Sequence, residues 1–534
     1  MKKFLTTLML VAMVAMLAAC GQSGGGGDKV SVSIAKENDV ISMNSMYATD
    51  GFSFEMIHAC IDGLMDVDGE GNVVNAIAES QEISEDGLVY TFKLRDAVWS
   101  NDKPVTANDF VYAWQSAITS PEAEYAYLFT AGNASVLNAD AVMAGEMDKT
   151  QLGVKAIDEK TLEVTLSQKT PYFLSMMAFP VFFPVNEEFA TEQGASYAMA
   201  PESLLANGPY KLVSREVGTK LVFEKNEKYW DVANVAVDEL IFNITPEVSA
   251  SVTAFEGGTL DFTKVSSSLI DGYKENAGFT EVLEGYLWYL QPNLDNANLA
   301  NKNLRLALAY ALDKQDLVDN ILKDGSVVGN GFVPTTLATG PDGKDFRATA
   351  GEFLVPDATK AQEYFKKAQE ELGKSEITIT MLYENSDPAK TAAEYIQSNL
   401  QTALPGLIVN MDMQTKEARI ELQKQHDFEV CLTRWGPDYA DPTTYLNLMI
   451  TGNSYNYGNY SNPAYDEKMK EAGLNPDAAA RWTQLLEAEK ILMEDAPVIS
   501  VFQVGGASLI NPSVTGIEAH AVGVPYVYKN IKVK

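Results

Sequence analysis

The stretch that decides the fold runs from residue 377 to residue 432 and reads ITITMLYENSDPAKTAAEYIQSNLQTALPGLIVNMDMQTKEARIELQKQHDFEVCL. Segments in which every second residue is apolar alternate with segments in which apolar residues recur every three or four positions. This pattern predicts strands at 377–381, 407–413 and 428–432 and helices at 388–404 and 416–424. Strands that alternate with helices pair in parallel and carry the helices on the faces of their sheet. The stretch therefore predicts an α/β fold.

Directly after the last of these strands, residues 434–446 read RWGPDYADPTTYL. Parallel sheets bind ligands beyond the carboxyl ends of their strands, which is where this loop begins. The loop offers two aromatic side chains, Trp435 and Tyr439, and two carboxylates, Asp438 and Asp441, among glycine and proline breakers. Such a loop suits a cationic ligand group. The alternative is that both rings pack in the core and that Asp438 only caps a turn.

The region before this unit is rich in helix signals. Apolar faces predict one helix over 304–312 and a second from Asp313 to about Gly325. A third covers 361–372 and is closed by Gly373.

The N-terminal half is rich in strand signals. Residues 66–71, DVDGEG, predict a hairpin tip and not a calcium loop, because the twelfth position is Ile77 instead of a bidentate Glu. A helix is expected over 51–65, and Thr106 with Asp109 matches a helix N-cap and its reciprocal acid. Alternating apolar residues predict strands at 30–34, 88–94, 162–166, 220–224 and 238–244.

The N-terminus has the pattern of an exported lipoprotein. Two lysines precede an apolar run over 4–16 that is short for a membrane span. Residues 17–20, LAAC, resemble the lipobox of bacterial lipoproteins, which implies diacylation of Cys20. We therefore expect a lipoprotein signal peptide over 1–20 and a flexible tether, GQSGGGGD, over 21–28. The alternative is a plain cleaved signal peptide with an incidental cysteine.

Length and charge limit the remaining possibilities. A chain of 534 residues suggests two or three domains. With 73 acids against 40 bases the formal net charge is −33, which repels phosphate backbones and argues against a nucleic-acid partner. Beyond the lipobox there are only Cys60 and Cys431, which cannot define a disulfide framework and are expected to be small buried apolar residues.

The sequence contains no recognisable catalytic motif. Its histidines, His58, His426 and His520, are scattered and not spaced as zinc ligands, so no metal site and no cofactor is expected. There is no nucleophile elbow and no dinucleotide-binding turn, and the Gly-Lys-Ser at 373–375 lacks the upstream glycine of a phosphate loop because position 368 is Ala. Carboxylates are too abundant for the sequence to select an acid–base pair.

Residues 94–114, LRDAVWSNDKPVTANDFVYAW, resemble the signature segment of the solute-binding proteins of oligopeptide and dipeptide ABC importers. The loop at 435–446 resembles the oligopeptide branch, and the resemblance extends over essentially everything after the tether. Further segments match in the expected order: AIAES at 76–80, YTF at 90–92, NGPY at 207–210, EGGTLD at 256–261 and NLRLAL at 303–308.

This resemblance implies an α/β fold of the periplasmic-binding-protein-like type II clamp, with two ligand-enclosing lobes and an inserted third lobe. Lobe I would combine 29–52, 186–287 and 504–534. Lobe II would be the insertion at 53–185, and lobe III would cover 288–503. The resemblance places the peptide between lobes I and III, with lobe III closing by a hinge.

The resemblance also assigns ligand contacts. In similar proteins the Asp of a Trp-x-x-Asp-Tyr motif holds the α-ammonium of the peptide, and that position here is Asp438. A desolvated ammonium needs a carboxylate partner. Main-chain groups would pair with the peptide as added strands. They belong to Trp435 and Gly436 on lobe III and to Asn38, Asp39 and Val40 on lobe I.

Further contacts are expected at four aromatic residues and one arginine. Core packing is the alternative for Tyr127, Tyr289 and Phe502, and an exposed ion pair is the alternative to a peptide carboxylate for Arg434. Tyr439 completes the expected set. Two departures alter the pocket: Lys416 stands where some relatives have a cleft Trp, and Phe502-Gln503 replaces a more Tyr-rich run.

These features favour a lipid-anchored receptor that captures oligopeptides and delivers them to ABC permease subunits driven by cytoplasmic ATPases. We expect a monomer on the extracellular face of the membrane, with a Gram-positive surface favoured and the periplasm as the Gram-negative alternative. The acyl chains would be the only membrane contact. Two alternatives stay open: a receptor of the same fold for a signalling peptide, a murein peptide or another cationic solute, and a secreted hydrolase.

Overall fold

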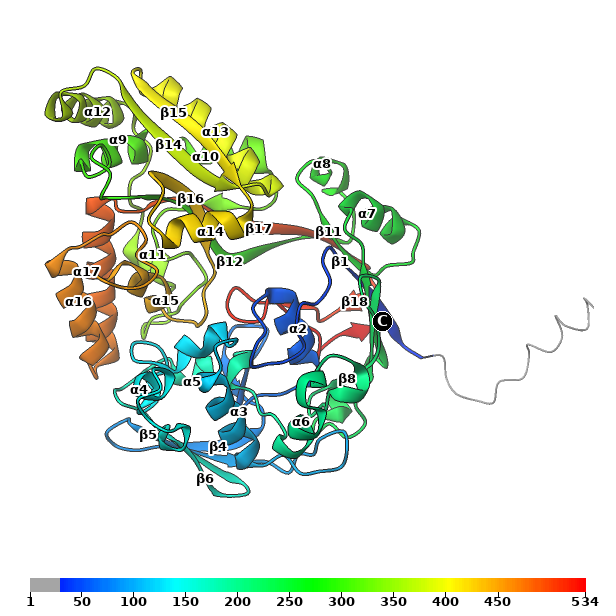
Figure 1. Cartoon of the computed structure of the whole chain (residues 1–534). Helices are drawn as coiled ribbons and strands as arrows, with labels where there is room; N and C mark the ends of the chain where they lie inside the picture. The colour runs from blue at the N-terminus through cyan, green and yellow to red at the C-terminus, as the bar shows by residue number, and fades with distance from the viewer. Residues whose placement is uncertain (1–28) are drawn as a thin grey trace, which may run out of the picture.

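The computed structural model describes residues 29–534, so the predicted signal peptide, Cys20 and the tether lie outside the described residues. Figure 1 shows three bodies: a lower one coloured blue to cyan, an upper one coloured green to orange, and one on the right that holds β1 and the C-terminal end. Below, residues 53–185 are called lobe II, residues 288–503 lobe III, and the remaining described residues lobe I. In the described part of the chain no helix is both long enough and apolar enough to cross a membrane.

One sheet of eleven strands runs through lobes I and III. Its order is β15-β14-β16-β12-β17-β11-β1-β10-β9-β8, and β13 pairs with β17 off this path. The strands are β1 Ser31–Lys36, β8 Tyr210–Glu216, β9 Lys220–Lys225, β10 Glu239–Ile244, β11 Phe262–Val265, β12 Phe279–Pro292, β13 Val327–Val328, β14 Ile377–Glu384, β15 Leu407–Gln414, β16 Val430–Trp435 and β17 Ile499–Ile510.

The parallel unit predicted from residues 377–432 is confirmed. Strand β14 pairs in parallel with β15 and with β16, and the connecting helices are α13 Asp387–Ala403 and α14 Lys416–Lys424. The last strand was predicted to end at residue 432. It runs to Trp435 instead, because its residues up to Trp435 pair antiparallel with β12. The ligand loop therefore starts at Gly436, two residues later than the predicted start at Arg434.

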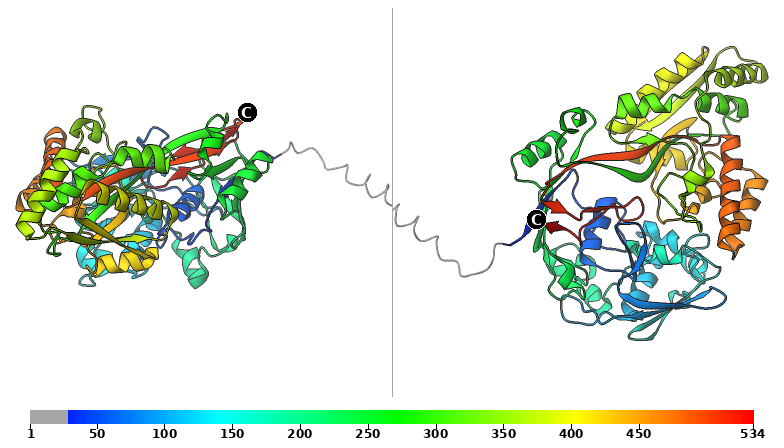
Figure 2. Two further views of the ribbon diagram at one scale, coloured as in Figure 1. Left: turned by 90° about the horizontal axis from the view of Figure 1, so that it is seen from above. Right: turned by 180° about the vertical axis from the view of Figure 1, so that it is seen from behind.

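Two long strands, β12 and β17, join lobe I to lobe III, and the right-hand view of Figure 2 shows them as a green and an orange-red ribbon between the two bodies. Their ladder is interrupted between the pairs Leu283–Gly505 and Leu287–Gln503. Gly285 lies in this interruption, where an added Cβ would be 1.8 Å from the carbonyl oxygen of Ala521. The only residue that fits this close approach is glycine.

Lobe II contains a separate antiparallel sheet of order β4-β5-β7-β6. The predicted cap of its helix α3, Ala107–Thr119, is confirmed because the backbone N–H of Thr106 donates to Asp109 at 2.8 Å. The helix buries Phe110 and Trp114 against the lobe core. The strands are β4 Ala78–Ile83, β5 Val89–Leu94, β6 Val154–Asp158 and β7 Thr161–Thr165.

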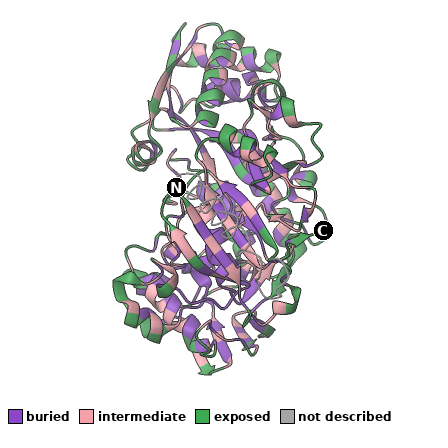
Figure 3. Ribbon diagram, turned by 90° about the vertical axis from the view of Figure 1, so that its right-hand side faces the viewer, coloured by how far each residue is buried: buried purple, intermediate pink, exposed green. Residues whose placement is uncertain are grey.

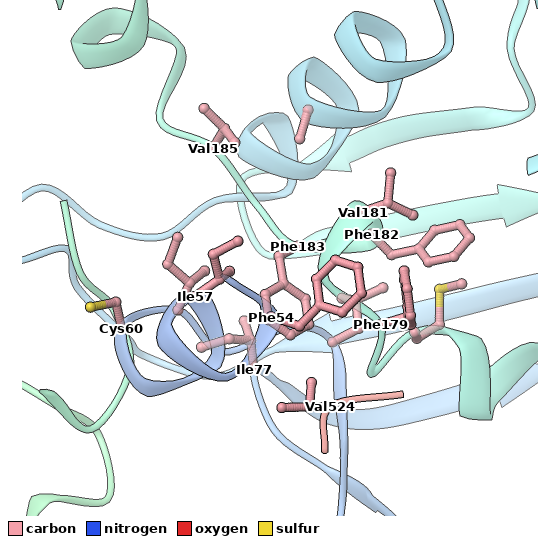
Figure 4. Packing of buried hydrophobic residues seen from close by; sticks show 14 of the residues in the cluster. Phe54, Ile57, Cys60, Ile77, Phe179, Val181, Phe182, Phe183, Val185 and Val524 are labelled. Atoms are coloured by element: carbon pink, nitrogen blue, oxygen red, sulfur yellow. The ribbon is translucent and has the colours of Figure 1, made fainter. Parts of the chain in front are cut away.

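The helix expected over 51–65 is shorter than predicted: α2 covers Gly51–Cys60. The chain turns away there because the carbonyl of Cys60 accepts hydrogen bonds from the N–H groups of Asn207 and Gly208, at 3.0 and 2.8 Å. Figure 4 shows side chains of α2 packed in the same core as a group of phenylalanines, in which the ring of Phe179 lies 5.0 Å from that of Phe54.

The hairpin predicted around residues 66–71 is confirmed, since β2 Met65–Val67 pairs antiparallel with β3 Val73–Asn75.

The helices of lobe III agree with their predicted positions. They include α9 Lys302–Ala311 and α12 Ala358–Leu372, which Gly373 closes in the left-handed conformation. The helix expected from Asp313 to Gly325 is divided into a short turn, Lys314–Asp316, and a π-helical turn, Leu317–Leu322.

Buried residues concentrate along the central strands, and exposed residues lie on the outward faces of the helices, as Figure 3 shows. Cys60 and Cys431 are both buried free thiols, which confirms their predicted role as apolar core residues. Burial raises the pKa of each thiol to about 12.

Candidate functional site

A cavity of about 860 Å³ lies between the three lobes. Lobe I lines it with residues 35–38 and 262–264, and lobe III with one face of α14 along its whole length and with residues 433–438. Lobe II contributes as well, through side chains such as Tyr127. The resemblance implied enclosure by lobes I and III alone, so the participation of lobe II is an addition to that expectation.

Asp438 faces this cavity without a cationic partner among the described residues. Its Oδ2 accepts a hydrogen bond from the hydroxyl of Tyr127 at 2.6 Å, and its backbone N–H donates to Thr444 at 3.1 Å. Desolvation raises the pKa of the Asp438 carboxyl to about 7, even though the Tyr127 hydrogen bond lowers it. A partly buried carboxylate in this state is stabilised by a proton or by a cationic ligand group.

The second carboxylate of the loop, Asp441, is already neutralised. Its two oxygens accept hydrogen bonds from Arg481 at 2.8 Å each, and Arg481 lies on α17, Ala478–Asp495. Thr443 adds a backbone and a hydroxyl donor. Asp441 and Arg481 are both buried, so this bidentate ion pair fixes the conformation of the loop. Asp438 is then the carboxylate of the loop that is left to pair with a ligand.

Tyr439 does not line the cavity, contrary to the expectation for it. Its ring stacks on Tyr172 of lobe II, with centroids 4.5 Å apart and planes 7° apart, and only 2% of the residue is exposed. The guanidinium carbon of Arg481 lies 5.6 Å from the Tyr172 ring. Tyr439 therefore fastens lobe III to lobe II behind the cavity, which explains why its side chain is unavailable to a ligand.

An aromatic wall stands beside Asp438. The ring of Trp435 meets Tyr455 edge-on at 5.0 Å, and Tyr455 lies 5.9 Å from Tyr127. The indole N–H of Trp435 is buried and has no hydrogen-bond partner in the part of the chain that the structure describes. The Trp435 carbonyl accepts from the hydroxyl of Tyr445 at 2.9 Å, which fixes the strand end from which the wall projects.

Main-chain groups are free on both sides of the cavity. Within the described residues neither the N–H nor the C=O of Gly436 makes a hydrogen bond, and the same holds for Asn38 on lobe I. Gly436 cannot carry a side chain without displacing Tyr286, whose ring would lie 2.4 Å from an added Cβ. These two positions are suited to pair with an extended backbone.

The end of the cavity at α14 is cationic. Buried Glu384 is shared by two arginines, since Arg419 approaches it to 3.1 Å and Arg434 to 3.7 Å. The guanidinium carbon of Arg434 also lies 5.1 Å from the ring centroid of Trp288. Lys416, in the first turn of α14, is exposed to the cavity. At this end two acids, Glu384 and Glu417, stand against four bases. The remaining positive charge suits a carboxylate. The four bases are Lys416, Arg419, Lys424 and Arg434.

The ionisable groups around the whole cavity balance, in contrast to the chain charge of −33. Two ion pairs, Lys36–Glu55 and Lys264–Glu284, lie within its lining. Such a balance suits a zwitterionic ligand better than an anion or a dication. The six acids are Glu37, Glu55, Glu124, Glu284, Glu417 and Asp438, and the six bases are Lys36, Lys264, Lys416, Arg419, Lys424 and Arg434.

The structure brings most of the expected contacts together and separates others from them. Four of the expected residues do not line the cavity: Asp39, Val40, Tyr439 and Phe502. The expected residues that line it are Asn38, Tyr127, Tyr289, Arg434, Trp435, Gly436 and Asp438.

The carboxylate of Asp39 accepts from the N–H of Gly218 at 2.7 Å and from that of Val40 at 2.8 Å, and the carbonyl of Val40 accepts from Arg215. These two residues therefore anchor a loop of lobe I. Phe502 is buried and stacks on Trp288.

Several cavity residues were not predicted from the sequence. Tyr455 and Tyr457 belong to the run YNYGNY at 455–460, whose aromatic density was an available signal. Arg419 lies in an ordinary amphipathic helix, and Tyr286 lies in a strand, so neither had a distinguishing local pattern. Lys36 and Glu55 come from different lobes, and their ion pair depends on tertiary structure alone.

Comparison with known proteins places these features in a family. Residues 72–457 match the family model of bacterial extracellular solute-binding proteins, family 5. The chain belongs to this family. It is 31% identical over 539 residues to the dipeptide-binding protein of Lactococcus lactis, with 97% of each chain covered. It is 30% identical over 464 residues to the periplasmic oligopeptide-binding protein OppA of Salmonella typhimurium, with 85% of this chain and 83% of the relative covered.

Solved structures agree with the fold expected from the sequence. The structure of Listeria monocytogenes OppA bound to peptide matches with a TM-score of 0.80 and 33% identity, covering 95% of this chain and 99% of that one. The pheromone receptor PrgZ matches with the same TM-score and 31% identity over 95% of this chain and all of that one. The predicted periplasmic-binding-protein-like type II fold is thereby confirmed for this family 5 protein.

Proposed function

We propose that this protein is a receptor that captures oligopeptides outside the cell and delivers them to an ABC permease. The observation that carries the proposal is Asp438, a carboxylate with a pKa near 7 that faces a cavity between lobes and has no cationic partner among the described residues. The α-ammonium of a peptide would supply that partner. Family membership and the peptide-binding names of the relatives support this choice of ligand.

The geometry suggests how the peptide lies. Its ammonium meets Asp438, and its main chain pairs with the free backbone groups of Gly436 and Asn38. Its later part points toward the cationic end at Lys416, Arg419 and Arg434, where a terminal carboxylate finds donors. Recognition of main chain and termini gives affinity without reading each side chain, and water fills what the side chains leave empty.

The proposal assigns no catalytic residue. Energy for transport would come from the ATPases of the permease, and the receptor would reach the membrane through lipid on Cys20 and act as a monomer. The anchor is inferred from the lipobox at 17–20, because Cys20 lies outside the described residues.

The first test is mass spectrometry of small molecules released when the purified protein is denatured. Recovery of intact peptides supports a receptor. Reproducible cleavage products from an added peptide library would support the hydrolase alternative, and recovery of a non-peptide solute would contradict the proposed ligand.

A second test addresses Asp438. Peptides with a free amino terminus are expected to bind, and their N-acetylated forms are expected to lose at least about 100-fold in affinity, because acetylation removes the cation. Equal affinity of both forms would reject the role proposed for Asp438. A same-fold receptor for another cationic solute would instead bind that solute and neither form of the peptide.

A further inference from the structure

Lobes I and II are built around one hydrophobic core, whereas lobe III has a core of its own. The shared core contains Ile34 of lobe I together with Phe92 and Trp114 of lobe II. The core of lobe III is a separate cluster. Because close-packed interiors move as units, lobes I and II form one body and lobe III forms a second.

Tyr439 is an exception to this division. Among the described residues of lobe III, it is the only one whose buried side chain belongs to the core of lobes I and II. Its ring stacks on that of Tyr172 in lobe II, and 2% of the residue is exposed. In Figure 1 this contact lies where α5 Phe173–Met176 of the lower body meets α15 Thr443–Leu446 of the upper one. The ring of Tyr439 is thus inserted from the second body into the first.

Two hydrogen bonds to one carbonyl add to this contact. The carbonyl of Gly132, in lobe II, accepts from the hydroxyl of Tyr172 at 2.9 Å and from the side-chain amide of Asn447, in lobe III, at 3.2 Å. We call Gly132, Tyr172, Tyr439 and Asn447 the latch. None of these four residues lines the main cavity. An effect of the latch on a ligand must therefore act through the relative position of the two bodies.

Opening of the main cavity would separate the two sides of the latch. The chain passes between lobe III and the other described residues at 287–288 and 503–504, on β12 and β17, next to the interruption in their ladder. Rotation of lobe III about these strands preserves the contacts within each core and breaks those between lobes II and III. It exposes the ring of Tyr439 to water and removes the acceptor of Asn447. Both changes cost free energy.

We infer that the latch biases the ligand-free protein toward the closed state and slows the release of a bound ligand. Contacts that form only in the closed state shift the equilibrium between open and closed states, with or without a ligand. A ligand then supplies less of the free energy of closure, and its escape requires the latch to break. The first part of this inference concerns the empty protein, and the second part rests on the proposed function.

Tyr172→Ala tests the latch from the side of lobe II. Tyr172 is half-buried, so its truncation removes the stacking on Tyr439 and little of the lobe II core. Small-angle X-ray scattering of the ligand-free protein, refolded after removal of bound solutes, is expected to show a larger radius of gyration for this variant than for the wild type. Tyr172→Phe is the matched control, because it keeps the ring and removes only the hydroxyl. Its radius of gyration should remain at the wild-type value.

Asn447→Ala tests the latch from the side of lobe III without changing either ring. Asn447 is half-buried, and the variant removes its hydrogen bond to Gly132. The radius of gyration should shift in the same direction as in Tyr172→Ala, by a smaller amount, because one hydrogen bond is lost. Circular dichroism and thermal unfolding establish that each variant is folded. Wild-type radii of gyration in the folded alanine variants would overturn the inference for the empty protein.

The effect on release is measured with pentaalanine as the probe, by stopped-flow tryptophan fluorescence, since Trp435 lines the main cavity. Dissociation from Tyr172→Ala is expected to be about 10-fold faster than from the wild type, because an aromatic pair and its buried area are lost. Tyr172→Phe should stay within about twofold of the wild-type rate, because its hydroxyl bonds within lobe II. An unchanged dissociation rate in Tyr172→Ala would overturn the role of the latch in release.

The two measurements separate this inference from the proposed function. If the wild type bound neither pentaalanine nor any member of a peptide library, the proposed function would fail. The scattering result would still decide whether the latch closes the empty protein.

Discussion

The hydroxyl of Tyr127, in lobe II, lies 2.6 Å from Oδ2 of Asp438, in lobe III, although 311 residues separate them in the sequence. Burial and the neighbouring charge of Asp438 raise the pKa of Tyr127 well above its ordinary value, so the phenol stays the donor at every pH of interest. This single neutral donor leaves Asp438 without charge compensation. The unliganded site is therefore prepared for a cation.

Asp438→Asn is expected to weaken binding of peptides with a free amino terminus by about 100-fold or more, because the ammonium then meets no negative charge. The measurement is titration calorimetry at pH 8, where the wild-type carboxyl is ionised. N-acetylated peptides serve as the control, since their binding should change little between the two proteins. Retention of full affinity by the Asn variant would contradict the assigned role.

Tyr127→Phe is expected to have a smaller effect, under about tenfold at pH 8, because it removes one hydrogen bond and no charge. The hydrogen bond from Tyr127 lowers the pKa of Asp438, so its loss raises that pKa further. The midpoint of the pH dependence should therefore move upward in this variant. An unchanged midpoint would show that the hydrogen bond does not form in solution.

Peptide affinity is expected to rise between pH 5 and pH 8 with a midpoint near 7. Below the midpoint the Asp438 carboxyl is protonated and must lose its proton to pair with the ammonium. Calorimetry in buffers of different ionisation enthalpy measures this proton release directly. A flat profile, or one that persists in Asp438→Asn, would assign the titration to another group.

The same shift predicts an opposite effect on the stability of the unliganded protein. The folded-state pKa is near 7, above the ordinary value of 3.8, so the folded protein binds the proton more tightly than the unfolded chain. Stability from this group is fully present below about pH 4 and is lost as the pH rises to 7. Asp438→Asn should thus raise the unfolding free energy at pH 8, by about 2–4 kcal/mol.

Arg481→Met should destabilise lobe III by about 3–5 kcal/mol, because it leaves buried Asp441 without its bidentate partner. Denaturant unfolding measures the loss. The matched control is the double variant Arg481→Met with Asp441→Asn, which removes both charges and should recover much of the stability. If the double variant is no more stable than the single one, the ion pair is not the cause.

How much the sequence predicted depends on the range of the interactions involved. The strands and helices over 377–424 were predicted because their periodicity is local, and the cap of α3 was predicted because Thr106 and Asp109 lie within one turn. The predicted end of this helix at residue 65 was wrong. Helix α2 ends at Cys60 because its carbonyl accepts hydrogen bonds from residues 207 and 208.

The site shows the same division. The two carboxylates of the loop were evident from the sequence, but their different roles were not. Asp441 is distinguished from Asp438 by its ion pair with Arg481, which lies 40 residues after Asp441 in the chain. Tyr439 and Phe502 were wrong as cavity residues for a related reason: their stacking partners, Tyr172 and Trp288, lie in other elements. The resemblance to a family supplied the position of Asp438, and the structure supplied its surroundings.

The charge balance of the main cavity has a kinetic consequence. The binding site is neutral, whereas the whole chain has a net charge of −33. The chain charge therefore acts on a peptide at long range, and the cavity residues act on it only at contact. Cationic peptides should associate faster than anionic ones. Added salt should reduce this difference in association rate, because it shortens the Debye length, which is about 8 Å at physiological ionic strength. Dissociation, which is governed by contacts inside the site, should respond far less to salt, so the surface selects which peptides arrive and the interior selects which ones stay.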